Sequence, residues 1–273
     1  MAIAAGRSYA LHTAPRRHPS ARAISWQDAQ TIKGRPLPLR PLSRTPVALA
    51  AALTLIAGGL TAIPAGATER AAATARVTSS TPMTAELLRS HELRSRPAGH
   101  VVTTLGTATE YGSQRVLAVV ARRGKWLGVL SESMPNGRAG WILAAGVRLR
   151  RPRYGLEVDR SARLMTVRRD GRVARRIRVA VGKSATATPV GLFAVTDVLR
   201  IAGGSSAYGC CALPITGHAR NVAPDRNRLG IHGTSAEGSI GSAASSGCLR
   251  GRGADMRWLA SRITAGTPLR IRP

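Results

Sequence analysis

Residues 229–250 constrain the fold more than any other stretch, because they place one imidazole and one thiol at the two ends of a loop of small residues. His232 is bracketed by Gly230 and Gly233, which let backbone pass close to the ring without Cβ clashes. A thiol is a weak nucleophile until it is deprotonated, and a neighbouring imidazole can accept its proton. The stretch therefore predicts a fold that brings His232 and Cys248 together.

The residues that precede Cys248 suit a tight turn. Ser245, Ser246 and Gly247 are all small, and the backbone N–H groups of Gly247 and Cys248 are the predicted donors to an oxyanion in acyl transfer. Ser245 and Thr234 are expected to support the turn through side-chain bonds to backbone, or to contact substrate.

Residues 245–250, Ser-Ser-Gly-Cys-Leu-Arg, together with the upstream His232-Gly233 pair, resemble the signature of the L,D-transpeptidase catalytic domain of the YkuD type. That signature is a His-Gly pair, a small-residue loop, and then Ser-His-Gly-Cys-hydrophobic-Arg. This chain departs from the second part at one position, where Ser246 replaces the usual His. A hydroxyl cannot carry the positive charge of an imidazolium, so activity or specificity differs if that charge is used.

A second element supports the resemblance, which covers about residues 153–273. Residues 188–193 read Thr-Pro-Val-Gly-Leu-Phe and match the family's Thr-Pro-x-Gly-x-Phe, a turn that feeds a buried strand. The resemblance implies a mainly β, β-sandwich-like catalytic domain with one C-terminal helix. In that fold the His and the Cys lie on adjacent strands or on the loops that join them.

The resemblance also implies the reaction. Cys248, deprotonated by His232, attacks a peptidoglycan tetrapeptide stem, releases D-Ala and forms a thioester that a neighbouring stem's amine resolves into a 3-3 type cross-link. The Gly233 carbonyl is expected to orient the His232 ring. Arg250 either pairs with a substrate carboxylate or locks the loop, and Tyr208 either lines the substrate groove or is an ordinary loop aromatic. No cofactor and no metal are expected.

Alternating apolar residues predict the strands of this domain. Strands are expected near residues 155–159, 163–168 and 172–181, and in the third Val173, Ile177, Val179 and Val181 share one face. Another strand, at 229–231, presents His232. A helix is expected over residues 253–263, where apolar residues form one stripe, and a final strand over 267–271.

Residues 99–150 contain short β-runs separated by turn signals. Pro135-Asn136-Gly137 is the strongest of these signals, and it is followed by Gly140-Trp141-Ile142. The pattern resembles a bacterial Src-homology-type (SH3-like) small barrel, in which Trp126 and Trp141 either bind peptide or pack in the core. Residues 68–98 are expected to be a linker with one short helix near 85–94.

The N-terminal 67 residues have the features of a secretory leader. Residues 1–44 are basic and rich in Pro and Ser, and residues 47–63 are 17 uncharged residues followed by Pro-Ala-Gly-Ala. We expect a disordered basic start, a signal sequence and export to the cell wall. An uncleaved signal that anchors the chain in the membrane is the alternative.

The net charge of +28 has two interpretations. It reflects either a GC-rich genome that favours Arg codons or affinity for anionic wall polymers. Nucleic acid is not an expected partner, because aromatic residues are only 3% of the chain and offer no base-stacking platform.

Cys210 and Cys211 are adjacent, which disfavours an ordinary disulfide. We interpret them as apolar filler, and a regulatory disulfide or a metal site with His218 is the alternative. The competing hypothesis for the whole chain is a non-catalytic wall-binding protein with a degenerate catalytic domain. A sortase-like enzyme fits less well, because Arg250 follows Cys248 by only two residues.

Overall fold

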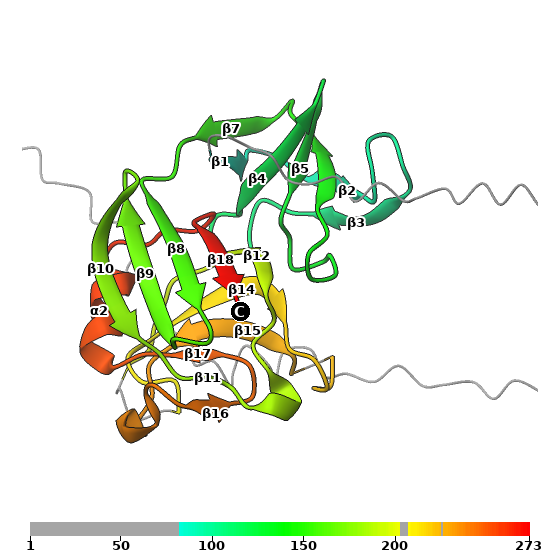
Figure 1. The fold of residues 1–273 in the computed structure, drawn as a ribbon. Coiled ribbons are helices and arrows are strands. Elements are labelled where there is room, and N and C mark those ends of the chain that lie inside the picture. Colours follow the sequence, from blue (N-terminus) through cyan, green and yellow to red (C-terminus); the bar gives the residue numbers. More distant parts are fainter. Residues whose placement is uncertain (1–81, 203–206, 225) are drawn as a thin grey trace, which may run out of the picture.

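The computed structural model describes residues 82–202, 207–224 and 226–273, and this part of the chain is mainly β (Figure 1). Its one α-helix is α2 (Gly253–Ala260), and two short 3-10 turns lie at Ser184–Thr186 and Glu237–Ser239. Within the described ranges no helix is long and apolar enough to cross a membrane. The expected signal sequence lies outside them.

Residues 82–150, here called the N-terminal module, carry one antiparallel sheet with the strand order β3-β2-β6-β5-β4-β1-β7. Its strands are β1 (Met83–Leu87), β2 (His91–Arg94), β3 (Val101–Leu105), β4 (Val116–Arg123), β5 (Trp126–Val129), β6 (Gly140–Leu143) and β7 (Val147–Arg150). The β-runs expected on both sides of residues 122–124 are confirmed. The resemblance to an SH3-like barrel stays a prediction.

The helix expected near residues 85–94 is wrong, since β1 and β2 occupy this segment of the expected linker. Ala85, Leu87 and Leu93 are completely buried, and His91 is 6% exposed. These four residues share one parity, so their period of two places them on the inner face of a sheet. The buried sheet therefore begins at Met83 rather than at residue 99.

Residues 151–273, here called the C-terminal module, contain three sheets. Their orders are β10-β9-β8-β18-β12, β13-β14-β15-β17 and β11-β16. The strands are β8 (Tyr154–Asp159), β9 (Leu164–Arg169), β10 (Arg172–Arg178), β11 (Val181–Gly182), β12 (Gly191–Ala194), β13 (Leu199–Arg200), β14 (Cys211–His218), β15 (Arg228–His232), β16 (Ala243–Ser245), β17 (Leu249–Arg250) and β18 (Pro268–Arg272). The expected mainly β fold with one C-terminal helix is confirmed.

The expectation that Val173 lies on the buried face of β10 is wrong. Val173 was placed with Ile177 on the buried side, yet Val173 is 41% exposed while Ile177 is 1% exposed. The register of β10 against β9 shifts between Val173 and Arg175. A bulge adds one residue to the strand, which turns the residues before it to the opposite face.

The core of the C-terminal module lies between the five-stranded and four-stranded sheets. Phe193 from β12, Leu213 from β14 and Ile231 from β15 are each at most 1% exposed there. The helix α2 adds Met256 and Leu259 to the same core. Two neighbouring strands of the four-stranded sheet, β15 and β17, run parallel, with His232 opposite Arg250.

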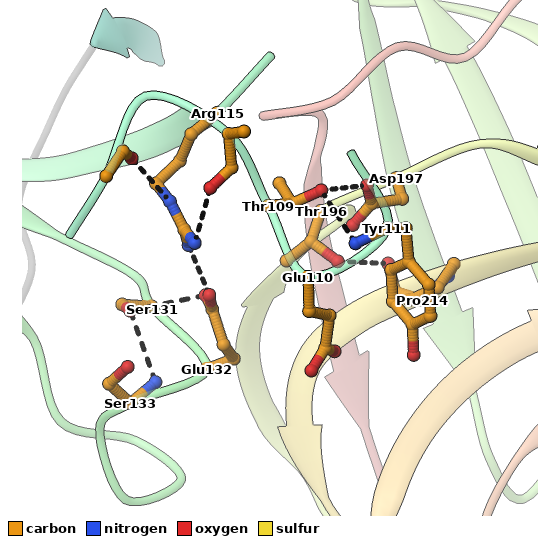
Figure 2. Close-up of polar contacts among 12 residues, drawn as sticks. Thr109, Glu110, Tyr111, Arg115, Ser131, Glu132, Ser133, Thr196, Asp197 and Pro214 are labelled. Carbon is orange, nitrogen blue, oxygen red and sulfur yellow. Dashed lines mark hydrogen bonds and ion pairs between the residues drawn. The ribbon is translucent and has the colours of Figure 1, made fainter. Parts of the chain in front are cut away.

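The two modules pack against each other through apolar and polar contacts. Ala118, Val120 and Leu130 of the N-terminal module form one buried cluster with Ala194 of β12. The side chain of Asn136 donates to the His218 carbonyl at 2.7 Å and accepts from the His218 N–H at 2.9 Å. The loop between β3 and β4 also reaches the C-terminal module, as Figure 2 shows.

Candidate active site

A pocket of about 220 Å³ opens beside the ends of β15 and β17. His232 ends β15, and Cys248 directly precedes β17, whose first residue Leu249 lies opposite Ile231. His232 and Cys248 both line this pocket. The prediction that the fold brings them together is confirmed.

Cys248 is half-buried, and its environment keeps the thiol protonated at neutral pH. Burial raises the pKa of the Cys248 thiol, while the Gly230 backbone N–H and the positive charge of Arg250 oppose that rise in part. Such a thiol needs a base beside it to become a nucleophile.

His232 is held as a neutral ring with a defined tautomer. Its Nδ1 lies 2.5 Å from the Gly233 carbonyl oxygen, and because a carbonyl only accepts, Nδ1 carries the hydrogen. The expected contact with Gly233 is thus confirmed, and Nε2 is left with its lone pair. Burial, helped by the charge of Arg250, lowers the pKa of His232 to about 4 despite the opposing effect of the Gly233 carbonyl.

The turn before Cys248 is braced by a buried hydroxyl. Ser245 is 1% exposed, and its Oγ donates to the Cys248 carbonyl at 2.6 Å. The Gly247 N–H donates to the same Oγ at 3.0 Å. Gly247 was expected to donate to an oxyanion, and in this structure its N–H donates to the Ser245 hydroxyl, so its role toward an oxyanion stays a prediction. The Cys248 N–H is the other predicted donor.

Thr188 is a positioning residue that the motif analysis treated only as part of a turn. It is 1% exposed, and its hydroxyl accepts from the Gly182 N–H at 2.8 Å and donates to the Gly247 carbonyl at 2.9 Å. One side chain thereby ties β11 to the turn that carries Cys248. The Thr-Pro-x-Gly-x-Phe element, which begins at Thr188, was the sequence feature that could have indicated this role.

Three other predicted residues have clear positions. Thr234 is 8% exposed, and its hydroxyl accepts from the Ala236 N–H at 3.1 Å, so it supports a turn. Ser245 also supports a turn, and neither residue lines the pocket. The Tyr208 ring stands edge-on to His232 with centroids 4.8 Å apart. Tyr208 lines the pocket, as does the exposed Ser246, which favours the interpretation of Tyr208 as a groove residue.

Arg250 lines the pocket without locking the loop through its guanidinium. Its backbone N–H donates to the Ala180 carbonyl at 3.0 Å, and its carbonyl accepts from the Ala180 N–H at 2.9 Å. Its Nε is buried and has no hydrogen-bond partner within the described part of the chain. This geometry favours the alternative in which Arg250 binds a substrate carboxylate.

Comparison with known proteins agrees with this geometry. Residues 153–271 match the L,D-transpeptidase catalytic domain of the YkuD family. The YkuD protein of Bacillus subtilis is 34% identical over 118 residues, which are 43% of this chain and 65% of that relative. Residues 153–271 form an L,D-transpeptidase catalytic domain.

A second relative, the YkuD protein of Bacillus licheniformis, is 32% identical over 120 residues, which are 44% of this chain and 66% of the relative. The chain therefore spans slightly less than two thirds of the length of either relative. The N-terminal module lies outside the family match.

Solved structures of L,D-transpeptidases are also similar. One from Enterococcus faecium is 22% identical, with a TM-score of 0.35, over 44% of this chain and 49% of that chain. One from Mycobacterium smegmatis is 17% identical, with a TM-score of 0.38, over 67% of this chain and 99% of that chain. The catalytic domain of the E. faecium enzyme acylated by ertapenem is 25% identical, with a TM-score of 0.35, over 45% of this chain and 99% of that chain.

The other two cysteines of the L,D-transpeptidase domain do not line the pocket of His232 and Cys248. Cys211 is 3% exposed in the core, where burial raises its pKa to about 12. The Cys210 Sγ lies 2.6 Å from the Cys211 Sγ and 3.6 Å from the Gly253 carbonyl oxygen. The position of Cys211 supports its interpretation as apolar filler.

Proposed function

We propose that this protein is an exported peptidoglycan L,D-transpeptidase that forms a Cys thioester with a tetrapeptide stem. The observation that carries the proposal is the shared pocket of Cys248 and a neutral His232, whose Nε2 keeps its lone pair. This arrangement fits a nucleophile with an adjacent general base.

The first half of the reaction transfers the acyl group to the enzyme. His232 Nε2 takes the proton of Cys248 as the sulfur attacks the carbonyl carbon that joins the third-position diamino acid to D-Ala. The Cys248 N–H stabilises the oxyanion, and Arg250 binds a carboxylate of the substrate. The imidazolium then gives its proton to the amine of D-Ala, which leaves, and a thioester remains.

The second half transfers the acyl group to an amine. The side-chain amine of a neighbouring stem attacks the thioester, His232 takes the proton of that amine, and Cys248 leaves and is reprotonated. A 3-3 type peptide cross-link results. Water in place of the amine gives the carboxypeptidase product.

A peptidoglycan substrate requires a protein that acts outside the membrane, and the leader-like residues 47–63 support this part of the proposal. Peptidoglycan stem peptides are the proposed partners, and anionic wall polymers are further partners compatible with the net charge of +28. Whether the leader is cleaved or retained as an anchor does not affect the chemistry of the site.

The deciding experiment measures D-Ala release from a tetrapeptide stem and analyses the muropeptides by mass spectrometry. Wild-type protein should release D-Ala and form cross-links, and Cys248→Ala should reduce both to background because the nucleophile is gone. Cys210→Ala removes a thiol that does not line the pocket and should leave both close to wild type.

Binding to sacculi without D-Ala release by the wild type would refute the enzymatic proposal. It would favour the non-catalytic wall-binding hypothesis instead, particularly if the Cys248→Ala variant binds equally well.

A further inference from the structure

We propose that Glu110, on the loop between β3 and β4, is a positioning residue that holds Arg228 in the catalytic pocket, where Arg228 binds a carboxylate of the donor peptide. The N-terminal module would thereby take part in substrate selection by the catalytic domain. The inference rests on the proposed function, because it names the group by which that site recognises its donor.

Arg228 is fixed on three sides. Its Nε donates to the Ile215 carbonyl at 2.6 Å, and one terminal nitrogen donates to the Thr196 hydroxyl at 3.0 Å. The other terminal nitrogen donates to the Glu110 carboxylate at 2.8 Å. The side chain is only 16% exposed, and its contact with Glu110 is an ion pair.

Arg228 is also one of the residues that line the pocket. Arg228 starts β15 four residues before His232, so the two share one face of the strand. Both line the pocket, as do Arg226 and Arg250. A guanidinium has five N–H groups, and within the described part of the chain three of those of Arg228 have partners, which leaves two for a ligand.

The charge of the pocket favours an anionic ligand. No Asp or Glu is among the described residues that line it, and His232 is neutral because its pKa is about 4. The charged side chains among these lining residues are therefore Arg226, Arg228 and Arg250, of which Arg228 is paired with Glu110. Guanidinium groups bind carboxylates through charge-assisted hydrogen bonds, and a tetrapeptide stem offers several.

The loop that carries Glu110 is itself anchored at both sides (Figure 2). The Thr109 hydroxyl accepts from the Tyr111 and Ser113 N–H groups at 3.3 and 3.2 Å and donates to Asp197 of the C-terminal module at 2.5 Å. Arg115 donates to two carbonyls of the loop, each at 3.0 Å, and forms an ion pair with Glu132. Glu110 is therefore presented by a braced loop.

The test measures equilibrium binding and turnover with the full chain. In a Cys248→Ala background, calorimetry compares a tetrapeptide with a free C-terminal carboxylate, the same peptide amidated at that carboxylate, and the peptide amidated at its side-chain carboxylates. Glu110→Gln should weaken binding of the unmodified peptide about five- to tenfold. One of the two amidated peptides should bind weakly to the Cys248→Ala protein, and Glu110→Gln should reduce its affinity little further. The carboxylate that is amidated in that peptide is then the one that Arg228 binds.

In the active protein, Glu110→Gln should raise KM by a similar factor and change kcat less than about twofold, because uniform binding is lost. Arg228→Lys should also abolish the discrimination between carboxylate and carboxamide. Asn136→Ala is the matched control, since it removes the two contacts to His218 but none to Arg228. It should leave binding and KM unchanged.

Equal weakening for all three peptides, or the same effect from Asn136→Ala, would overturn the inference and leave only a docking role for Glu110. Absence of turnover in the wild type would contradict the proposed function instead. The calorimetric comparison does not require turnover, so the two failures are distinguishable.

Discussion

His232 and Cys248 are each shifted toward their neutral forms, and both shifts have the same main cause. Burial disfavours the imidazolium and the thiolate alike, so it lowers the pKa of His232 to about 4 and raises that of Cys248. Arg250 adds a charge that also disfavours the imidazolium. The resting site is therefore a neutral thiol and imidazole, and in the proposed reaction proton transfer accompanies the attack on substrate.

This neutral resting state predicts how alkylation of Cys248 depends on pH. Because the pKa of the thiol is raised, the thiolate is a minor species throughout the neutral range, and its fraction grows about tenfold per pH unit below that pKa. The rate of iodoacetamide labelling at Cys248, measured by peptide mass spectrometry, should rise continuously from pH 6 to 8. A rate that is flat over this range would indicate a preformed thiolate–imidazolium pair and contradict the expectation.

For individual residues, the sequence predicted which side chains come together. It predicted less well which hydrogen-bonding atoms remain available to a substrate. His232, Gly233 and Cys248 are placed by neighbouring strands, so their spacing was sufficient to predict their association. The Gly247 N–H was assigned to substrate, yet the Ser245 hydroxyl occupies it. Such competition depends on a side-chain rotamer and on burial, which the order of residues does not specify.

The turn between β16 and β17 depends on a glycine at position 247. Its φ is +118°, and a Cβ added there would lie 2.9 Å from the Leu229 Cδ2. Gly247→Ala should therefore destabilise the fold by about 1–3 kcal/mol and lower turnover further by displacing Cys248. Urea unfolding and D-Ala release measure the two effects.

Gly238→Ala provides the matched control for that substitution. A Cβ at Gly238 has no atom within 4 Å, so stability and activity should stay close to wild type. If Gly247→Ala behaved like Gly238→Ala, the turn would be less constrained than its geometry indicates.

The strands of the C-terminal module followed closely from alternation of apolar residues, because one face of each is buried. Prediction failed where a local irregularity or a missing partner decided the outcome. Val173 lies before a bulge that only pairing with β9 reveals. Residues 85–94 became strands because β4 and β6 offer them hydrogen-bond partners that lie further along the chain.

The two modules are joined by a continuous interface rather than by a linker alone. Ala118, Val120 and Leu130 share a buried cluster with Ala194, and Glu110 contacts an arginine of the catalytic pocket. The sequence suggested two separate units because each has its own strand pattern. The polar contacts between them, from Thr109, Glu110 and Asn136, come from loops, whose composition carries no periodic signal.

The buried carboxylate of Asp197 makes this interface essential to the stability of the whole molecule. Asp197 is completely buried, and its Oδ1 accepts from the Thr109 hydroxyl at 2.5 Å. Its Oδ2 has no hydrogen-bond partner within the described residues. Thr109→Val keeps the side-chain shape but removes the donor, so both oxygens would be buried without a partner.

Thr109→Val should therefore lower the free energy of unfolding by about 2–4 kcal/mol, since an unsatisfied buried carboxylate costs more than a neutral group. Urea unfolding followed by tryptophan fluorescence measures this change. Thr104→Val is the control, because Thr104 is an exposed residue of β3 and should tolerate the same substitution. Equal stability of the two variants would contradict the view that Asp197 depends on the N-terminal module, because only the Thr109 hydroxyl donates to Asp197.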